Sequence, residues 1–218
     1  TDLIARLDEL LAELVARLEA DPLFGALIEG TISRPRLIAL YTQIWHCLSV
    51  SAEALRGAGD SMALYGSDHP AFAEETYARF KSELYQDLAA ELRQHGSEES
   101  GHDDWMLEDL VGLGVPREEV PSSTPGPAMA AYMAGFRQAA VSPTPAGVAG
   151  QAYILEGISE LRWGRTVENL VARSGIPNIE GAVSCLGKHA IADIGHGENA
   201  RRRLRRITDP RDQSAILH

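Results

Sequence analysis

Apolar residues recur at three- and four-residue steps along most of this 218-residue chain, and this periodicity restricts the fold more than any other feature. The N-terminal segment shows it most clearly, in five leucines: Leu3, Leu7, Leu10, Leu14 and Leu18. Such spacing places the residues on one face of an α-helix. No segment shows the alternation of apolar and polar residues between turns that marks a β-strand. The sequence therefore predicts an all-α fold.

Turn residues divide the chain into roughly seven helices within a single domain that spans 1–218. The expected helices cover about 3–20, 33–57, 70–96, 101–114, 128–141, 145–173 and 180–207, with a short helical turn after Pro22. Residues 115–127 are dense in Pro and Ser and indicate a loop. Residues 209–218 are expected to form a C-terminal tail.

The formal net charge of −11 limits the partners that the protein can bind. Nucleic-acid binding needs a basic surface, so no such partner is expected. No apolar run reaches the roughly 18–20 residues of a membrane span, and charges interrupt the N-terminal segment, so neither a membrane helix nor a secretory signal is expected. Cys47 and Cys185 form no C-x-x-C pair, which favours a reducing cytoplasm. A homodimer is the default assembly.

Three metal-capable side chains, His189, Asp193 and His196, lie at i, i+4 and i+7 in the last expected helix. At 3.6 residues per turn, these positions fall within about 60° of one another. Their neighbours on that face are small or apolar, so we expect the face to be buried. A lone buried histidine is usually a satisfied core residue, but two histidines and an aspartate on one buried face need partners. A hydrogen-bonded network without metal is the alternative.

A second motif, Glu99-Ser-Gly-His102, has the E-x-x-H spacing that lets one helix supply a carboxylate and an imidazole to one ion. The motif is weak on its own. His95 and Glu98 lie close by in the sequence, and either of them could replace an assigned ligand.

Glu156 is the third feature, because it is a charged residue in the apolar stretch QAYILEG. A buried carboxylate without a partner would stay protonated, because burial opposes its charge. A bound metal ion would stabilise the charged form. The alternatives are an ion pair with Arg162 or Arg165, or plain solvent exposure. Glu160, one turn later, could take the place of Glu156.

Together these residues offer three carboxylates and three imidazoles, a mixture that suits two iron or manganese ions. A structural zinc site needs four ligands and would leave two of the six unused. Ferritin-like bundles use two E-x-x-H motifs, whereas this chain has one, and Asp193-x-x-His196 would have to serve as the other.

The combined pattern resembles the heme-oxygenase-like diiron oxidases and oxygenases. It consists of His-x-x-x-Asp-x-x-His late in the chain, a Glu about 33 residues before it, and an earlier Glu-x-x-His. The spacing is most similar to the branch that includes the fatty-acid decarboxylase forming terminal alkenes. The helical layout is similar over nearly the full chain, including the segment Tyr41–His46.

The resemblance implies a seven-helix, heme-oxygenase-like bundle with two iron ions between core helices. The resemblance implies that one ion binds Glu99, His102 and His189, and that the other binds Glu156, Asp193 and His196. One of the three carboxylates would bridge, and all three would take part in catalysis. Manganese or a mixed manganese–iron pair is the variant to consider.

The implied activity is O2-dependent oxidation of a small organic substrate that is amino-acid-like or fatty-acid-like. The reaction would be N-oxygenation, desaturation or oxidative C–C cleavage, with an external electron donor as a further partner. We expect Tyr41, Trp45, His46 and Tyr153 to line the substrate pocket, although aromatic residues at helical spacing are more often plain core.

Three other functions share this fold or composition. A true heme oxygenase would need an axial histidine in its first helix, and residues 1–30 contain none. A cofactor-free enzyme similar to those of thiamin salvage or quinone-cofactor synthesis would not need six metal ligands. A non-enzymatic helical protein that holds metal is the third alternative.

Overall fold

The computed structural model describes residues 2–65 and 82–218, and this part of the chain is helical without any strand. The α-helices are α1 (Leu3–Ala20), α2 (Pro22–Ile28), α3 (Arg34–Tyr65), α5 (Glu83–Glu98), α6 (His102–Gly112), α7 (Glu119–Ser122), α8 (Pro127–Ala140), α9 (Gly147–Arg173), α10 (Ser184–Leu204) and α11 (Pro210–Leu217), with a 3-10 helix, η1, at Ile179–Ala182. The all-α prediction is confirmed. The described residues hold ten α-helices rather than the expected seven, because short helices occupy segments predicted as loop, turn or tail.

Side-chain caps define the starts of the first two helices. The carboxylate of Asp2 accepts a hydrogen bond from the backbone N–H of Ile4, which starts α1. Asp21 accepts from the N–H groups of Leu23 and Phe24, and Pro22 occupies the first turn of α2. These caps satisfy N–H groups that have no partner inside the helix.

Helix α3 continues to Tyr65 instead of ending near Gly57. Gly59 within it lies so close to α5 that an added Cβ would stand 2.6 Å from the carbonyl oxygen of Ala89. The glycines here permit close helix packing and do not end the helix. The predicted helix over 70–96 agrees with α5 from Glu83 onward, and its first part, 70–81, lies outside the described residues.

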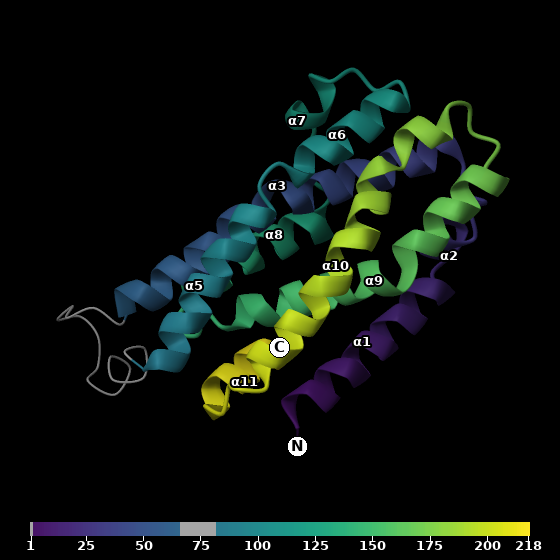
Figure 1. Ribbon diagram of the computed structural model, residues 1–218. Helices are drawn as coiled ribbons and strands as arrows, with labels where there is room; N and C mark the ends of the chain where they lie inside the picture. Colours follow the sequence, from purple (N-terminus) through teal and green to yellow (C-terminus); the bar gives the residue numbers. More distant parts are fainter. Residues whose placement is uncertain (1, 66–81) are drawn as a thin grey trace.

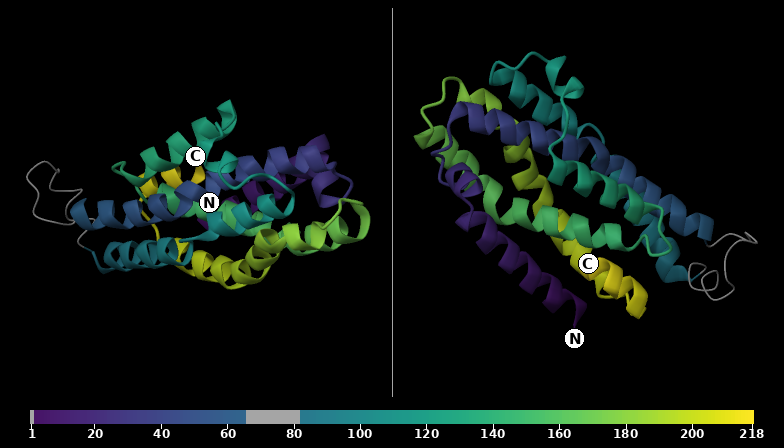
Figure 2. Two further views of the ribbon diagram at one scale, coloured as in Figure 1. Left: turned by 90° about the horizontal axis from the view of Figure 1, so that it is seen from above. Right: turned by 180° about the vertical axis from the view of Figure 1, so that it is seen from behind.

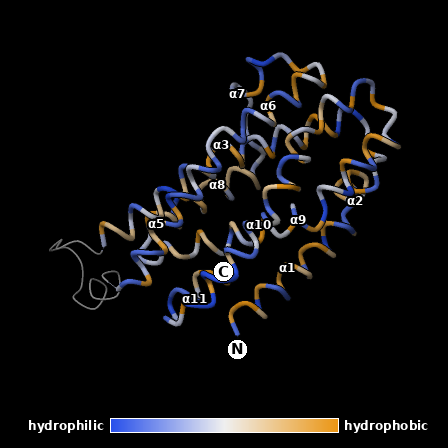
Figure 3. Tube along the Cα trace, in the orientation of Figure 1, coloured by the Kyte–Doolittle hydropathy of each residue, from blue (hydrophilic) through white to orange (hydrophobic). Residues whose placement is uncertain are grey.

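The helices associate in pairs, some between neighbours in the sequence and one, α1 with α9, between distant segments. Helices α3 and α5 run alongside each other, as do α9 and α10, and α1 packs against α9 (Figures 1 and 2). Hydrophobic positions are distributed along every helix rather than gathered in one continuous run (Figure 3). Within the described residues, no helix combines the length and apolar character needed to cross a membrane.

Two groups of buried apolar side chains form the core. One includes Leu92 of α5 and Leu204 of α10, and the other includes Met106 of α6 and Leu186 of α10. The stretch of α10 between its two core residues, and the junction between α5 and α6, carry buried polar residues. The predicted ligands therefore lie where the two apolar groups meet.

The predicted tail at 209–218 is wrong for most of its length, because it contains helix α11. Asp212 is fully buried and accepts a hydrogen bond from the hydroxyl of Tyr85, and Ile216 belongs to the core. Gly150 of α9 lets α11 approach closely, since an added Cβ would overlap the carbonyl oxygen of Ile216. Periodicity over eight residues was too short to reveal this docking.

Candidate metal centre

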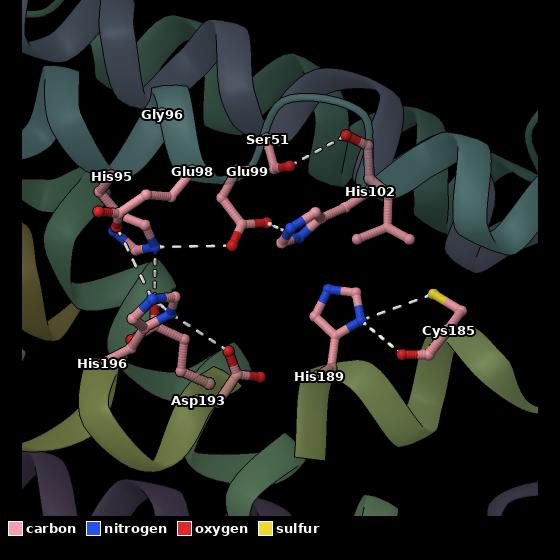
Figure 4. A network of polar contacts seen from close by, with 12 residues as sticks. Ser51, His95, Gly96, Glu98, Glu99, His102, Cys185, His189, Asp193 and His196 are labelled. Atoms are coloured by element: carbon pink, nitrogen blue, oxygen red, sulfur yellow. Dashed lines mark hydrogen bonds and ion pairs between the residues drawn. The ribbon is translucent and has the colours of Figure 1, made fainter. Parts of the chain in front are cut away.

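Helix α10 turns the side chains of His189, Asp193 and His196 toward the junction of α5 and α6 (Figure 4). His189 and Asp193 are buried, and the side chain of His196 is 20% exposed. Nδ1 of His189 lies 2.8 Å from the backbone carbonyl oxygen of Cys185. A carbonyl only accepts, so Nδ1 carries the proton, and Nε2 is left buried without a partner. This arrangement presents Nε2 as a metal ligand.

Asp109 of α6 holds the first turn of α10. Its carboxylate is fully buried and accepts hydrogen bonds from the N–H of Ser184 at 3.0 Å, its hydroxyl at 2.7 Å and the N–H of Cys185 at 2.8 Å. Asp109 thus caps α10 one turn before His189. No sequence signal identifies this residue, because its partners are about 75 positions away.

The Glu99-x-x-His102 motif spans the junction between two helices, where the sequence predicts a break, and not a single helix as its E-x-x-H spacing suggests. Glu99 is the C-cap of α5 and His102 is the first residue of α6. Gly101 between them has φ of 89°, a left-handed conformation that glycine adopts readily and that turns the chain. Both side chains remain buried, and Nδ1 of His102 lies 3.0 Å from Oε2 of Glu99.

Glu156 projects from α9 into the same region and is buried, with 7% exposure. Neither of its carboxylate oxygens has a hydrogen-bond partner. The alternative partners are engaged elsewhere, since Arg162 pairs with Glu19 and Arg165 with Glu29. Glu160 is exposed to solvent. The structure therefore favours Glu156 over Glu160 as the inward-facing carboxylate.

His95 of α5 is buried and also faces this cluster. Its Nε2 lies 2.6 Å from Oε1 of Glu156 and 3.8 Å from Oε1 of Glu99. Glu98 lies farther out, with its side chain 45% exposed and 3.7 Å from Nε2 of His196. Of the two residues left open as replacements, His95 is inside the cluster and Glu98 is at its rim.

Two groups of potential ligand atoms result, and Glu99 belongs to both. In one, Glu99, His102 and His189 bring their ligand atoms within 4.8 Å of one another. In the other, Glu99 is joined by His95 and His196. Asp193 and Glu156 border the second group, because Nδ1 of His196 is 3.3 Å from Oδ1 of Asp193 and 3.9 Å from Oε1 of Glu156. Glu99 is thus the carboxylate that the two groups share.

Close packing of acids and imidazoles shifts their pKa values. Burial opposes the charge on His95, but the carboxylates of Glu156 and Glu99 outweigh it and raise its pKa to about 9. Burial also opposes ionisation of Glu99, yet His102 and His95 hold the pKa of that carboxyl well below its usual range. The carboxylate of Asp193 raises the pKa of His196. Protons on His95 and His196 therefore balance the neighbouring acids, and metal cations can replace them.

Several buried atoms of the cluster lack a hydrogen-bond partner, and they fit a metal centre. Buried polar atoms normally have a hydrogen-bond partner. Around this space several lack one: His95 Nε2, both carboxylate oxygens of Glu156, His189 Nε2, Asp193 Oδ1 and His196 Nδ1. Each is a nitrogen or oxygen that can donate a lone pair to a cation, and imidazole with carboxylate is a donor set that suits iron.

An apolar cavity of about 310 Å³ opens onto the cluster. Its wall includes Leu14, Leu48, Leu55, Phe136 and Trp163. Five residues of the cluster form one part of the same wall: His95, Glu99, Glu156, His189 and Asp193. Among the described residues that line it there is no lysine or arginine.

The structure places none of the four aromatic or histidine residues expected in the pocket on this wall. Tyr41 and Trp45 pack with the core around α2, α3 and α6. His46 contacts the hydroxyl of Ser123, and the hydroxyl of Tyr153 donates to Asp8. Helical spacing identified these residues as inward-facing but could not say toward which interior space they point.

Comparisons with known proteins agree with the helical fold. The chain is similar to a crystal structure, at 2.30 Å resolution, of a domain of unknown function with a heme oxygenase-like fold from Shewanella denitrificans OS217. The two share 18% sequence identity with a TM-score of 0.70, and the match covers 98% of this chain and 84% of the other. No curated protein matches the chain. The molecule is therefore an all-α protein of heme-oxygenase-like fold.

The family follows from the sequence match over 62–218. This range, which contains every predicted ligand, matches the family described as iron-containing redox enzymes. The chain belongs to that family, and the resemblance inferred from the motifs is confirmed at this level.

Proposed function

We propose that this protein is a non-heme diiron oxidase or oxygenase, which uses O2 to oxidise a small organic substrate. The observation that carries the proposal is the set of buried, unpartnered donor atoms from α5, α9 and α10 around one space. Membership of an iron-containing redox family supports iron as the metal. Two ferrous ions bound there would supply the electrons for the reduction of O2.

The protein's residues would position the metals and shield them. Glu99 has one carboxylate oxygen toward His102 and the other toward His95, so it can span two ions. The carbonyl of Cys185 fixes the ring of His189, which leaves Nε2 to bind. The apolar cavity wall would limit the access of bulk water to a bound substrate.

The cavity also favours one kind of substrate. It offers apolar surface and no lysine or arginine among its described wall residues, so with the metals bound a substrate carboxylate would find its positive partner at the metals. Of the two substrate classes that the sequence suggests, an aliphatic, fatty-acid-like molecule suits this wall better than an amino acid with two charged groups.

The test is an anaerobic titration of the purified protein with ferrous iron, followed by mixing with O2. We expect two ions per chain, consumption of O2 and a transient visible absorption. Glu156→Gln should bind fewer than two ions, whereas Glu160→Gln, one turn away on α9, should load like the parent. A manganese titration run in parallel identifies the preferred metal.

Two results would contradict the proposal. Loading well below two ions per chain would remove the dinuclear centre. Two tightly bound ions that never consume O2, with any candidate substrate added, would indicate a protein that holds metal without catalysis.

A further inference from the structure

His95 lies one helical turn before Glu99 on α5, so the two side chains leave the helix on the same face. His95 is not one of the six ligands that the resemblance to the family implies. The structure nevertheless places it inside the cluster, with 6% exposure, and its ring centre is 5.2 Å from that of His196 (Figure 4).

The contact between His95 and Glu156 is not an ordinary hydrogen bond. Nε2 and Oε1 are only 2.6 Å apart, yet both atoms lack a partner in hydrogen-bond geometry. The ligand atoms of His95, Glu99 and His196 also lie within 4.8 Å of one another, close enough to hold one ion. A cation in this group would give Nε2 of His95 the partner that it lacks.

From this geometry we propose that His95 is a seventh ligand, bound to the ion that Glu156, Asp193 and His196 would hold. The inference rests on the proposed dinuclear site and adds a residue to it. His95 does not replace an assigned ligand, because each of the other six still faces the cluster.

The extra ligand makes the two ions unlike each other. The first would have two imidazoles and one carboxylate, from His102, His189 and Glu99. The second would have two imidazoles and two carboxylates, with Glu99 available to either. Without His95 the second ion would have a single nitrogen ligand, a set that suits manganese, and the added imidazole shifts its preference toward iron.

His95→Gln is the sharpest variant, because the glutamine amide can still hydrogen-bond to a carboxylate but offers no imidazole nitrogen. His46→Gln is the matched control, since His46 is a buried histidine outside the cluster that contacts Ser123. The measurement is a competition titration of the full chain with Fe(II), and separately with Co(II), whose visible absorption reports coordination. Circular dichroism checks that each variant folds.

For the parent and His46→Gln we expect two ions per chain. In His95→Gln one of the two affinities should fall at least tenfold, the absorption of one Co(II) ion should change, and the preference for Fe(II) over Mn(II) should decrease. Free imidazole should restore the lost affinity in His95→Ala. Trp105 is stacked on His102, with 4.0 Å between the ring centres, so an ion bound by His102 should quench its fluorescence. This quenching should be the same in His95→Gln as in the parent.

The possible failures separate the two proposals. Two unchanged affinities in His95→Gln would overturn the role of His95 while leaving the diiron site intact. An equal loss at both ions, without rescue by imidazole, would also overturn it and would assign His95 a structural role. A parent protein that binds fewer than two ions would refute the dinuclear site itself, and the seventh ligand with it.

Discussion

Replacing Asp109 with alanine should cost more stability than any nearby surface change, although Asp109 touches no proposed ligand. The carboxylate is fully buried and accepts three hydrogen bonds at the start of α10, two of them from the backbone N–H groups of Ser184 and Cys185. Neither N–H has a partner within the helix, because the first turn of a helix has no preceding carbonyl to bond.

The expected magnitude follows mainly from the buried donor, the N–H of Cys185, because Ser184 is exposed and water can reach its N–H. Leaving a buried donor without an acceptor costs about 1–3 kcal/mol. Alanine is a better helix former than aspartate by roughly 0.5 kcal/mol, which offsets part of the loss in α6. We therefore expect Asp109→Ala to lower the free energy of unfolding by about 0.5–2.5 kcal/mol.

Urea denaturation followed by circular dichroism measures this change. Glu108→Ala is the control, because Glu108 is the preceding residue on α6 and forms only an exposed ion pair with Arg117. Asp109→Asn should fall between the two, since it keeps the shape and one acceptor oxygen. A loss for Asp109→Ala no greater than that for Glu108→Ala would refute the capping role.

Two further predictions concern residues of α9. Gly150→Ala should destabilise the protein by about 1–3 kcal/mol, because its Cβ would overlap the backbone of α11. Gly164→Ala on the same helix meets nothing within 4 Å and should be neutral or stabilising, so equal midpoints of the two variants in thermal unfolding would contradict this reasoning. Ala152→Phe should partly fill the apolar cavity and weaken binding of a twelve-carbon carboxylate more than that of a six-carbon one. The fluorescence of Trp163 in the cavity wall reports this binding, and equal weakening of both ligands would argue that the aliphatic chain does not enter the cavity.

Local spacing predicted the parts of this protein that one helix encodes by itself. The first helix has the bounds that its leucine spacing predicts, although its buried residues are Leu3, Ile4, Leu7, Leu11 and Val15 rather than the whole predicted stripe. The i, i+4, i+7 arrangement of His189, Asp193 and His196 could also be read directly, since a helix converts spacing into direction.

Contacts between distant segments could not be predicted in that way. The partner of α11 is α9, some 60 positions earlier, and eight residues of periodicity do not reveal a docking site. The aromatic residues Tyr41 and Tyr153 are buried as their spacing suggests, but the interior space they face depends on how other helices are arranged.

The sequence by itself determined that the chain is helical, and that acids and imidazoles suited to metal lie on a few helix faces. Only the tertiary structure decided which of them meet: it turned Glu99 and His102 together across a break at Gly101, added His95, and left Glu160 in solvent. The physical reason is the sequence distance over which each kind of interaction acts. Side-chain direction along a helix is set by its repeat of 3.6 residues, whereas convergence between helices depends on the packing of side chains far apart in the sequence.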